Sequence, residues 1–179
     1  MIRKNAVTWG SVAAMTAAGI AFTLNYEGAP KPGATESVAI VPVPGDPHTL
    51  DVGGLTYYPS TGLRVKPGDR VSIERAIEEF SLATKENVDC VRRSCPDCKT
   101  PMTLVDLAGD FVHQFGCTTW RNSSLLTLAR ARKLQEHCDF YLRYRFVRKF
   151  DCATPGNKIC AGVWTRAKAR AELCHSAIN

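Results

Sequence analysis

The stretch "TLNYEGAPKP" (residues 23–32) joins an uncharged N-terminal segment to the polar remainder of the chain. Glu27 lies at this junction, directly before a glycine. From Asn5 to Tyr26 the sequence carries no charged residue, and Arg3 and Lys4 precede it. Because about 20 apolar residues suffice to cross a bilayer, Glu27 is either the boundary residue of a membrane span or a side chain with a role of its own.

The N-terminal segment is weakly apolar, because Ala, Gly, Ser and Thr dominate it. Small residues recur at four-residue spacing, which permits close packing of a helix face; they are Ala6, Gly10, Ala14 and Ala18. The positive flank predicts a cytoplasmic N-terminus and an exported remainder. A cleaved signal peptide is the alternative. No convincing small-x-small cleavage site precedes a clear mature start, so we favour an uncleaved signal-anchor over residues 1–25.

The charge of the chain is unevenly distributed. The 179 residues suit one domain over residues 26–179 plus the N-terminal appendage. From residue 121 onward there are 12 Lys and Arg against 4 Asp and Glu, a net charge of +8, whereas the first 120 residues carry −2. A basic C-terminal third indicates an anionic partner, such as nucleic acid, a membrane surface or a cell-wall polymer, or else a solvated basic helix face.

Eight cysteines follow residue 89 and none precedes it. An even number confined to one region indicates disulfides formed in an oxidising compartment. A structural zinc site usually shows two close pairs. "CVRRSCPDC" supplies only one Cys-x-x-Cys, so we expect a local disulfide here, with no metal and no cofactor. The pairing stays open: Cys160 and Cys174 flank the last expected helix and can pair with each other, with Cys138 or with Cys152.

The pattern of turn residues and apolar spacing predicts an α+β fold. Residues 28–71 hold most of the Pro and Gly, with short β-prone runs at 38–43 and 55–58, which indicates a small β-rich lobe. Ser72 is a plausible N-cap for a long helix with apolar residues at helical spacing. Further helices are expected from about Thr103, in one or two pieces between 123 and 150, and from about Val163. A larger helical C-terminal lobe thus follows the β-rich lobe.

Several of these segments, in this order, resemble the phage-type lysozyme (endolysin) family. "NSSLLTLARA" (122–131) is similar to the Ser-Thr-Leu-Leu segment of the family, "EHCDFYLRY" (136–144) to its Ala-Cys-Asp stretch, and "CAGVWTRAKARAELC" (160–174) to its C-terminal ending. Upstream, "RVKPGDRVSIERA" (64–76) resembles the turn and helix start after the active-site hairpin. The likeness spans nearly all of residues 26–175. It implies a lysozyme-like fold that hydrolyses the β-1,4 bond between N-acetylmuramic acid and N-acetylglucosamine in peptidoglycan and causes host cell lysis.

The N-terminus resembles the signal-anchor-release subgroup of this family. Members are exported by their own N-terminal helix, wait tethered and inactive, and refold when the helix leaves the membrane. The resemblance implies a location at the host inner membrane facing the periplasm, and then in the periplasm. Peptidoglycan and the inner membrane are the partners it implies, with no nucleic acid and a monomer after release.

"YEG" (26–28) resembles the Glu-Gly opening of the catalytic motif, which makes Glu27 the general acid. Glycoside hydrolysis needs a proton donor for the leaving oxygen and a group that activates water. A carboxyl in a partly apolar cleft can hold its proton near neutral pH. "GDPHTLDVGG" (45–54) resembles the family hairpin, and on that match Thr49 helps to position the water.

The second carboxylate is the departure from the family pattern, because the residue six before Thr49 is Val43 and not Asp. Asp46 and Asp51 flank Thr49 and are the two candidates. Asp51 would share a face with Thr49 if both lay on one strand, whereas Asp46 stands in a Gly-Asp-Pro turn, where Asp is common for local reasons. If neither acts, the alternative is a catalytically impaired, membrane-anchored lysozyme-like domain that binds the cell wall.

Overall fold

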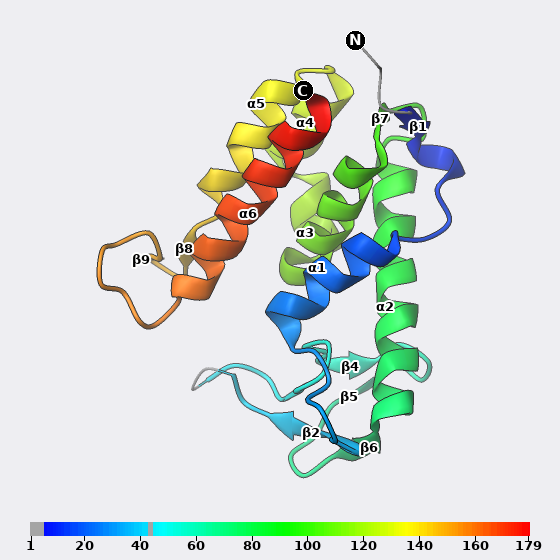
Figure 1. Ribbon diagram of the computed structural model, residues 1–179, viewed down its shortest axis with the longest axis vertical. Helices are drawn as coiled ribbons and strands as arrows, with labels where there is room; N and C mark the ends of the chain where they lie inside the picture. The colour runs from blue at the N-terminus through cyan, green and yellow to red at the C-terminus, as the bar shows by residue number, and fades with distance from the viewer. Residues whose placement is uncertain (1–5, 43–44) are drawn as a thin grey trace. The chain divides into compact units, whose positions relative to one another are not determined.

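A computed structural model describes residues 6–42 and 45–179 and shows a chain of helices and short strands (Figure 1). The chain forms two compact units, one of residues 1–16 and 87–179 and one of residues 17–86. The long helix α2 (Ile73–Ser94) runs from the second unit into the first. Arg3, Lys4 and Val43, on which part of the sequence interpretation rests, lie outside the described residues.

The unit of residues 17–86 is small and β-rich, as expected. It contains α1 (Ala17–Glu27), β2 (Glu36–Ile40), β3 (Thr49–Leu50), β4 (Tyr57–Tyr58), β5 (Leu63–Arg64) and β6 (Arg70–Ser72). Strand β2 lies between β3 and β6, antiparallel to both, and β4 pairs with β5. The strands expected at 38–43 and 55–58 are therefore present as β2 and β4, with shifted bounds. Their core is the buried cluster of Leu50, Val52, Leu55, Val65, Ala76, Phe80 and Ala83.

Helix α2 begins where the N-cap pattern predicts. The backbone N–H of Arg75 donates to Ser72 Oγ at 3.2 Å, which satisfies one of the free donors at the helix start. Ala76 and Phe80 lie three to four residues apart and are buried in the core of this unit. The same helical spacing brings Val88 and Val91 into the core of the other unit.

The unit formed by residues 1–16 and 87–179 is mainly helical. Its elements are β1 (Ala6–Thr8), a 3₁₀ turn (Trp9–Ser11), β7 (Lys99–Pro101), α3 (Met102–Arg121), α4 (Ser124–Arg130), α5 (Leu134–Phe140), a 3₁₀ turn (Tyr141–Arg143), β8 (Phe146–Val147), β9 (Phe150–Asp151) and α6 (Ala161–Ile178). The expected helices are thus present. The prediction of helix up to residue 150 is wrong at its end, because residues 146–151 form a β-hairpin.

The uncharged N-terminal segment is folded into three short elements and is not one continuous helix. Strand β1 pairs antiparallel with β7. Trp9 is fully buried and donates its indole N–H to Thr100 Oγ1 at 2.8 Å. Val12 and Met15 are also buried. The apolar side chains of this segment therefore contribute to a protein core. Within residues 6–42 and 45–179, no helix has the length and apolarity needed to cross a membrane.

All eight cysteines lie in disulfides, which confirms the expected oxidised state. The bonds are Cys90–Cys117, Cys95–Cys98, Cys138–Cys174 and Cys152–Cys160. The first links α2 to α3, the second closes the loop before β7, and the third links α5 to α6. The two pairs that involve Cys160 and Cys174 are among those the sequence left open.

A buried charge cluster joins α3 to α6. Asp110 is 0 % exposed, and Arg166 and Arg170 are nearly as buried. Arg166 Nη2 lies 2.6 Å from Asp110 Oδ1, and Arg170 Nε lies 2.6 Å from Asp110 Oδ2. Burial alone raises the pKa of Asp110, but Arg170 and Arg166 outweigh it and hold that pKa below its usual value. The carboxylate is therefore ionised and bonded to both guanidinium groups.

Substitution of Asp110 by Asn is expected to destabilise the protein strongly, because it leaves two buried cations without their counter-ion. The expected loss is about 3–5 kcal/mol in the free energy of unfolding, measured by urea denaturation under oxidising conditions. Glu36→Gln is the control, since it breaks the exposed Glu36–Arg70 pair and should cost less than about 1 kcal/mol. Equal losses for the two variants would contradict this account.

Candidate active site

The position of Glu27 is set by the end of helix α1. Glu27 is the last residue of the helix, and the next residue, Gly28, has a φ of 101°. Its N–H donates to Leu24 O at 2.9 Å. Glycine adopts this left-handed conformation without the steric cost that a Cβ brings. The Glu-Gly pair therefore stops the helix and turns the chain directly after the carboxylate.

The backbone after Glu27 lies directly against the turn that follows β3. A Cβ placed on Gly28 would lie 2.0 Å from the carbonyl oxygen of Asp51. Gly53 N–H donates to Gly28 O at 2.9 Å. These contacts join two motifs that the sequence separates, the "YEG" opening and the "DVGG" turn. The turn is thereby held beside the end of α1.

The carboxylate of Glu27 lies over Gly54. A Cβ on Gly54 would come within 2.4 Å of Glu27 Oε2, and Gly54 has a φ of +61°. Glu27 itself is half-buried. On the neighbouring Gly53, a Cβ would meet the ring of Phe80 at 2.6 Å. The two consecutive glycines thus leave room for a carboxylate at one position and for a core phenyl ring at the other.

Thr49 and Asp51 lie in the same unit but in different kinds of structure. Thr49 is 7 % exposed and pairs with Ile40 across the β2–β3 ladder. Strand β3 ends at Leu50, so Asp51 lies in the following turn, and strand alternation does not place it on the face of Thr49. Asp51 Oδ1 accepts hydrogen bonds from Ser37 Oγ at 2.7 Å and Val38 N–H at 2.9 Å. This carboxylate holds the turn against β2.

Asp46 lies on the loop that connects β2 to β3, which includes the undescribed residues 43–44. Its side chain is exposed, and the neighbouring His48 is half-buried. The loop leads into Thr49, three residues after Asp46. Of the four predicted site residues, Asp51 lies in the turn after β3, and Glu27 lies against that turn. Thr49 lies in β3, two residues before Asp51.

Sequence reasoning missed Ser37 and Gly54. Ser37 is fully buried, and besides its bond to Asp51 it accepts a hydrogen bond from Val52 N–H at 3.3 Å. No local pattern marks a serine 14 residues before its partner. Gly54 belongs to the double glycine of the hairpin motif, and this motif was the signal that could have identified it. The motif alone does not say which of the two glycines lies beneath the Glu27 carboxylate.

The chemistry available here is that of a carboxyl group and its neighbours. A carboxyl can donate a proton when neutral and accept one when ionised, which is general acid–base catalysis. Within the part of the chain that the structure describes, no group of three His, Cys, Asp or Glu side chains is placed to hold a metal ion. The site is therefore built from carboxylates, a threonine hydroxyl and backbone.

Comparison with known proteins shows the fold. No protein-family model matches the chain, and no curated protein matches its sequence. The muramidase domain of SpmX from Asticaccaulis excentricus superposes with a TM-score of 0.68 at 14% identity, covering 91% of this chain and 98% of that domain. An endolysin from Escherichia coli O157:H7 phage FAHEc1 gives a TM-score of 0.68 at 15% identity, covering 89% of this chain and 92% of its own. The chain has a lysozyme-like fold.

Replacing Gly28 by Ala is expected to destabilise the fold more than replacing Gly33 by Ala. Both glycines have positive φ, 101° and 76°, but a Cβ at Gly33 meets nothing within 4 Å. Gly33→Ala should therefore cost only the backbone term of about 1–2 kcal/mol. Gly28→Ala should cost at least about 2 kcal/mol more, because the obstructing atom is a backbone carbonyl. Urea denaturation of both variants measures the difference, and equal losses would refute the close approach.

Proposed function

We propose that this chain is a lysozyme-type peptidoglycan hydrolase that cleaves the β-1,4 bond between N-acetylmuramic acid and N-acetylglucosamine and lyses a host cell. One observation carries the proposal: a half-buried glutamate at the end of a helix, its carboxylate packed on the glycine turn after β3. This arrangement occurs within a fold similar over nine-tenths of the chain to a muramidase domain and an endolysin.

In this mechanism Glu27 is the general acid. It donates its proton to the glycosidic oxygen as the bond to the anomeric carbon breaks, and water adds to that carbon after losing a proton to a second carboxylate. Thr49 would help to position the water. An inverting enzyme holds its two carboxyl groups about 6.5–9.5 Å apart to admit this water, and a retaining enzyme about 5–5.5 Å apart.

The contacts of the two candidate bases differ. Asp51 already accepts bonds from Ser37 and Val38, so using it as a base weakens the link between the turn and β2. Asp46 is exposed on the loop before Thr49, so it can approach a water without disturbing that link. This contrast favours Asp46 as the base and Asp51 as the residue that supports Glu27 through the turn.

Substitution of Glu27 by Gln is expected to lower activity at least about 100-fold, because an amide cannot donate the proton. The measurement is release of reducing ends from isolated peptidoglycan, together with clearing of outer-membrane-permeabilised Gram-negative cells. Glu36→Gln is the matched control, since Glu36 is an exposed glutamate whose partner is Arg70. Full activity of Glu27→Gln would refute its role as the acid.

The same assays separate the two aspartates. Asp46→Asn is expected to lower activity while the protein stays folded. Asp51→Asn is expected to lose about 1–3 kcal/mol of stability, because its hydrogen bonds to Ser37 and Val38 are weakened. If Asp46→Asn stays fully active and Asp51→Asn is inactive while folded, the assignment of the base is reversed.

One specific observation favours a second function. The position six before Thr49 is Val43, where the family resemblance leads one to expect Asp. A chain without a working base would be a catalytically impaired, membrane-anchored domain that binds the cell wall. Sedimentation of the folded, oxidised wild type with isolated peptidoglycan, without any release of reducing ends, would establish this alternative in place of hydrolysis.

We further propose that residues 1–25 anchor the new protein in the host inner membrane, facing the periplasm, until they are released. The weakly apolar composition of the segment supports this, and four disulfides suit an exported protein. In the folded protein, however, Trp9, Val12 and Met15 of this segment are buried. A segment cannot span a bilayer and occupy a protein core at the same time, so the tethered and folded states would exclude each other.

The double variant Ala14→Leu with Ala18→Leu is expected to delay lysis without changing the activity of the folded protein. Both alanines are exposed in the fold, while leucine favours the bilayer. The measurement is the lysis time of cells expressing the variant, alongside reducing-end release by purified protein. Ala14→Ser with Ala18→Ser is the control and should not delay lysis. Identical lysis times for the leucine variant and wild type would contradict membrane release.

A further inference from the structure

The segment between α5 and α6 keeps large apolar side chains in contact with solvent. In this β8–β9 segment (residues 143–160), Phe146 is 52% exposed, Phe150 is 40% exposed and Ile159 is 67% exposed, and Val147 is exposed as well. No other separate stretch of equal length has more than three large exposed apolar residues among those that the structure describes. Figure 1 shows the strands and the following loop (orange) extending beyond the start of α6.

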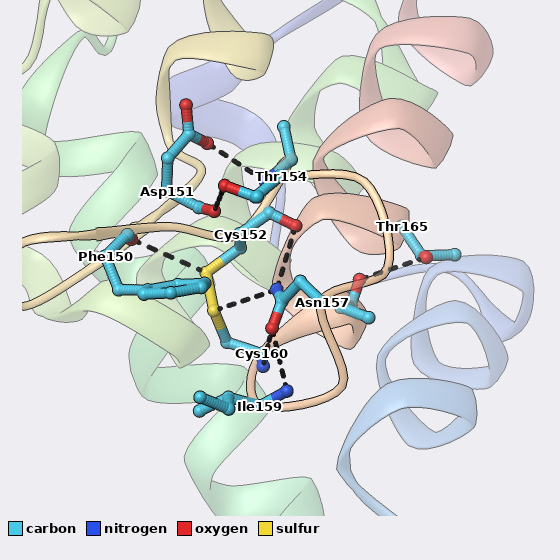
Figure 2. The surroundings of a disulfide bond; sticks show 10 residues. Phe150, Asp151, Cys152, Thr154, Asn157, Ile159, Cys160 and Thr165 are labelled. Atoms are coloured by element: carbon cyan, nitrogen blue, oxygen red, sulfur yellow. Dashed lines mark hydrogen bonds between the residues drawn. A yellow bond between two sulfur atoms is a disulfide. The ribbon is translucent and has the colours of Figure 1, made fainter.

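The loop that carries Ile159 is held by a disulfide and by hydrogen bonds. The Cys152–Cys160 disulfide closes it, and Asn157 Nδ2 donates to Cys152 O at 3.1 Å. Asn157 Oδ1 accepts from the backbone N–H of Ile159 at 2.8 Å. Figure 2 shows Asn157 inside the loop and Ile159 on its edge. The most exposed of these apolar side chains is therefore carried on a constrained backbone.

The hairpin turn carries a basic residue in an unfavourable conformation. Val147 pairs with Phe150, which leaves Arg148 and Lys149 as the two turn residues. Arg148 has a φ of 55°, where Gly or Asn is usual in a two-residue turn. A side chain in this region costs about 1–2 kcal/mol. Retention of such strain is a reason to look for a function in the residue itself.

The segment combines this apolar surface with positive charge. It contains five Lys and Arg against one acid, Asp151, a net charge of +4. Asp151 is already paired with Arg145 at 3.1 Å. Trp164, one turn into α6, lies beneath the guanidinium of Arg145 and the amine of Lys168, at 5.7 and 5.6 Å from its ring centre. The cations therefore surround a mixed aromatic and aliphatic surface.

This combination fits one kind of partner better than others. A polyanion such as nucleic acid or a cell-wall polymer attracts the cations, but it gives no apolar phase in which an aliphatic side chain such as Ile159 can be buried. The surface of an anionic bilayer offers both, because its headgroups attract Lys and Arg while the acyl boundary accepts apolar and aromatic side chains.

We propose that the β8–β9 segment of the folded protein binds the surface of an anionic lipid bilayer, inserting Phe150 and Ile159 at the headgroup boundary. This contact is separate from the N-terminal segment and from peptidoglycan hydrolysis. It would retain the folded protein at the membrane surface through a second, reversible attachment.

The test is co-sedimentation of the full oxidised chain with vesicles of phosphatidylethanolamine and phosphatidylglycerol, and with vesicles of phosphatidylcholine alone. Phe150→Ser with Ile159→Ser, and separately Arg148→Ser with Lys149→Ser, should each weaken binding to anionic vesicles about tenfold or more. The matched controls are Leu63→Ser with Leu173→Ser, which are exposed apolar residues elsewhere, and Lys85→Ser with Arg93→Ser, which are exposed cations on α2. These controls should bind like the wild type.

Any binding through the N-terminal segment is common to all variants, so the difference between variants isolates the β8–β9 segment. Equal unfolding temperatures show that the variants are folded. Unchanged anionic-vesicle binding by both β8–β9 variants overturns the proposal. So does a loss of binding to isolated peptidoglycan with vesicle binding intact, because the partner is then the polymer.

Discussion

The close contact between Gly28 and the turn of residues 51–54 determines the geometry around Glu27. The carbonyl oxygen of Asp51 lies 2.0 Å from the place that a Cβ on Gly28 would take, and Gly53 N–H donates to Gly28 O. Through Asp51 the same turn is bonded to Ser37 of β2. The end of α1, the turn and β2 are therefore one connected backbone structure, and the Glu27 carboxylate takes its position on Gly54 from it.

Much of this fold could be predicted because its elements have local signals. The N-cap at Ser72, the apolar spacing of α2 and α3, and the Pro- and Gly-rich region before them are each visible within a few residues. The β8–β9 hairpin had no such signal. Its two turn residues are Arg148 and Lys149, and Arg148 has a positive φ. Two-residue hairpin turns are usually recognised in a sequence by Gly or Asn, and this turn contains neither. A helix was therefore expected in its place.

In the candidate site, too, the features with a local sequence signal could be predicted and the others could not. Glu27 and the double glycine stand in short motifs, so their importance could be predicted. The bonds of Asp51 could not, because Ser37 and Val38 lie 14 and 13 residues away and become neighbours only once β2 and β3 pair. Cysteine pairing is a similar case, since Cys138–Cys174 depends on how α5 packs on α6. Contacts between distant segments follow from the fold and not from spacing.

The N-terminal segment has a composition that two different constraints can produce. Gly10 suits the fold, because a Cβ there would lie only 3.0 Å from Pro96 O. Thr23 is fully buried and bonds to Gly19 O within α1. These residues lower the apolarity of the segment for reasons that need no membrane. Ala14 and Ala18 are different, since both are exposed in the fold and packing would tolerate larger residues there. Small side chains at those two positions are what a weakly held membrane helix needs, so they, rather than the glycines, carry the argument for release.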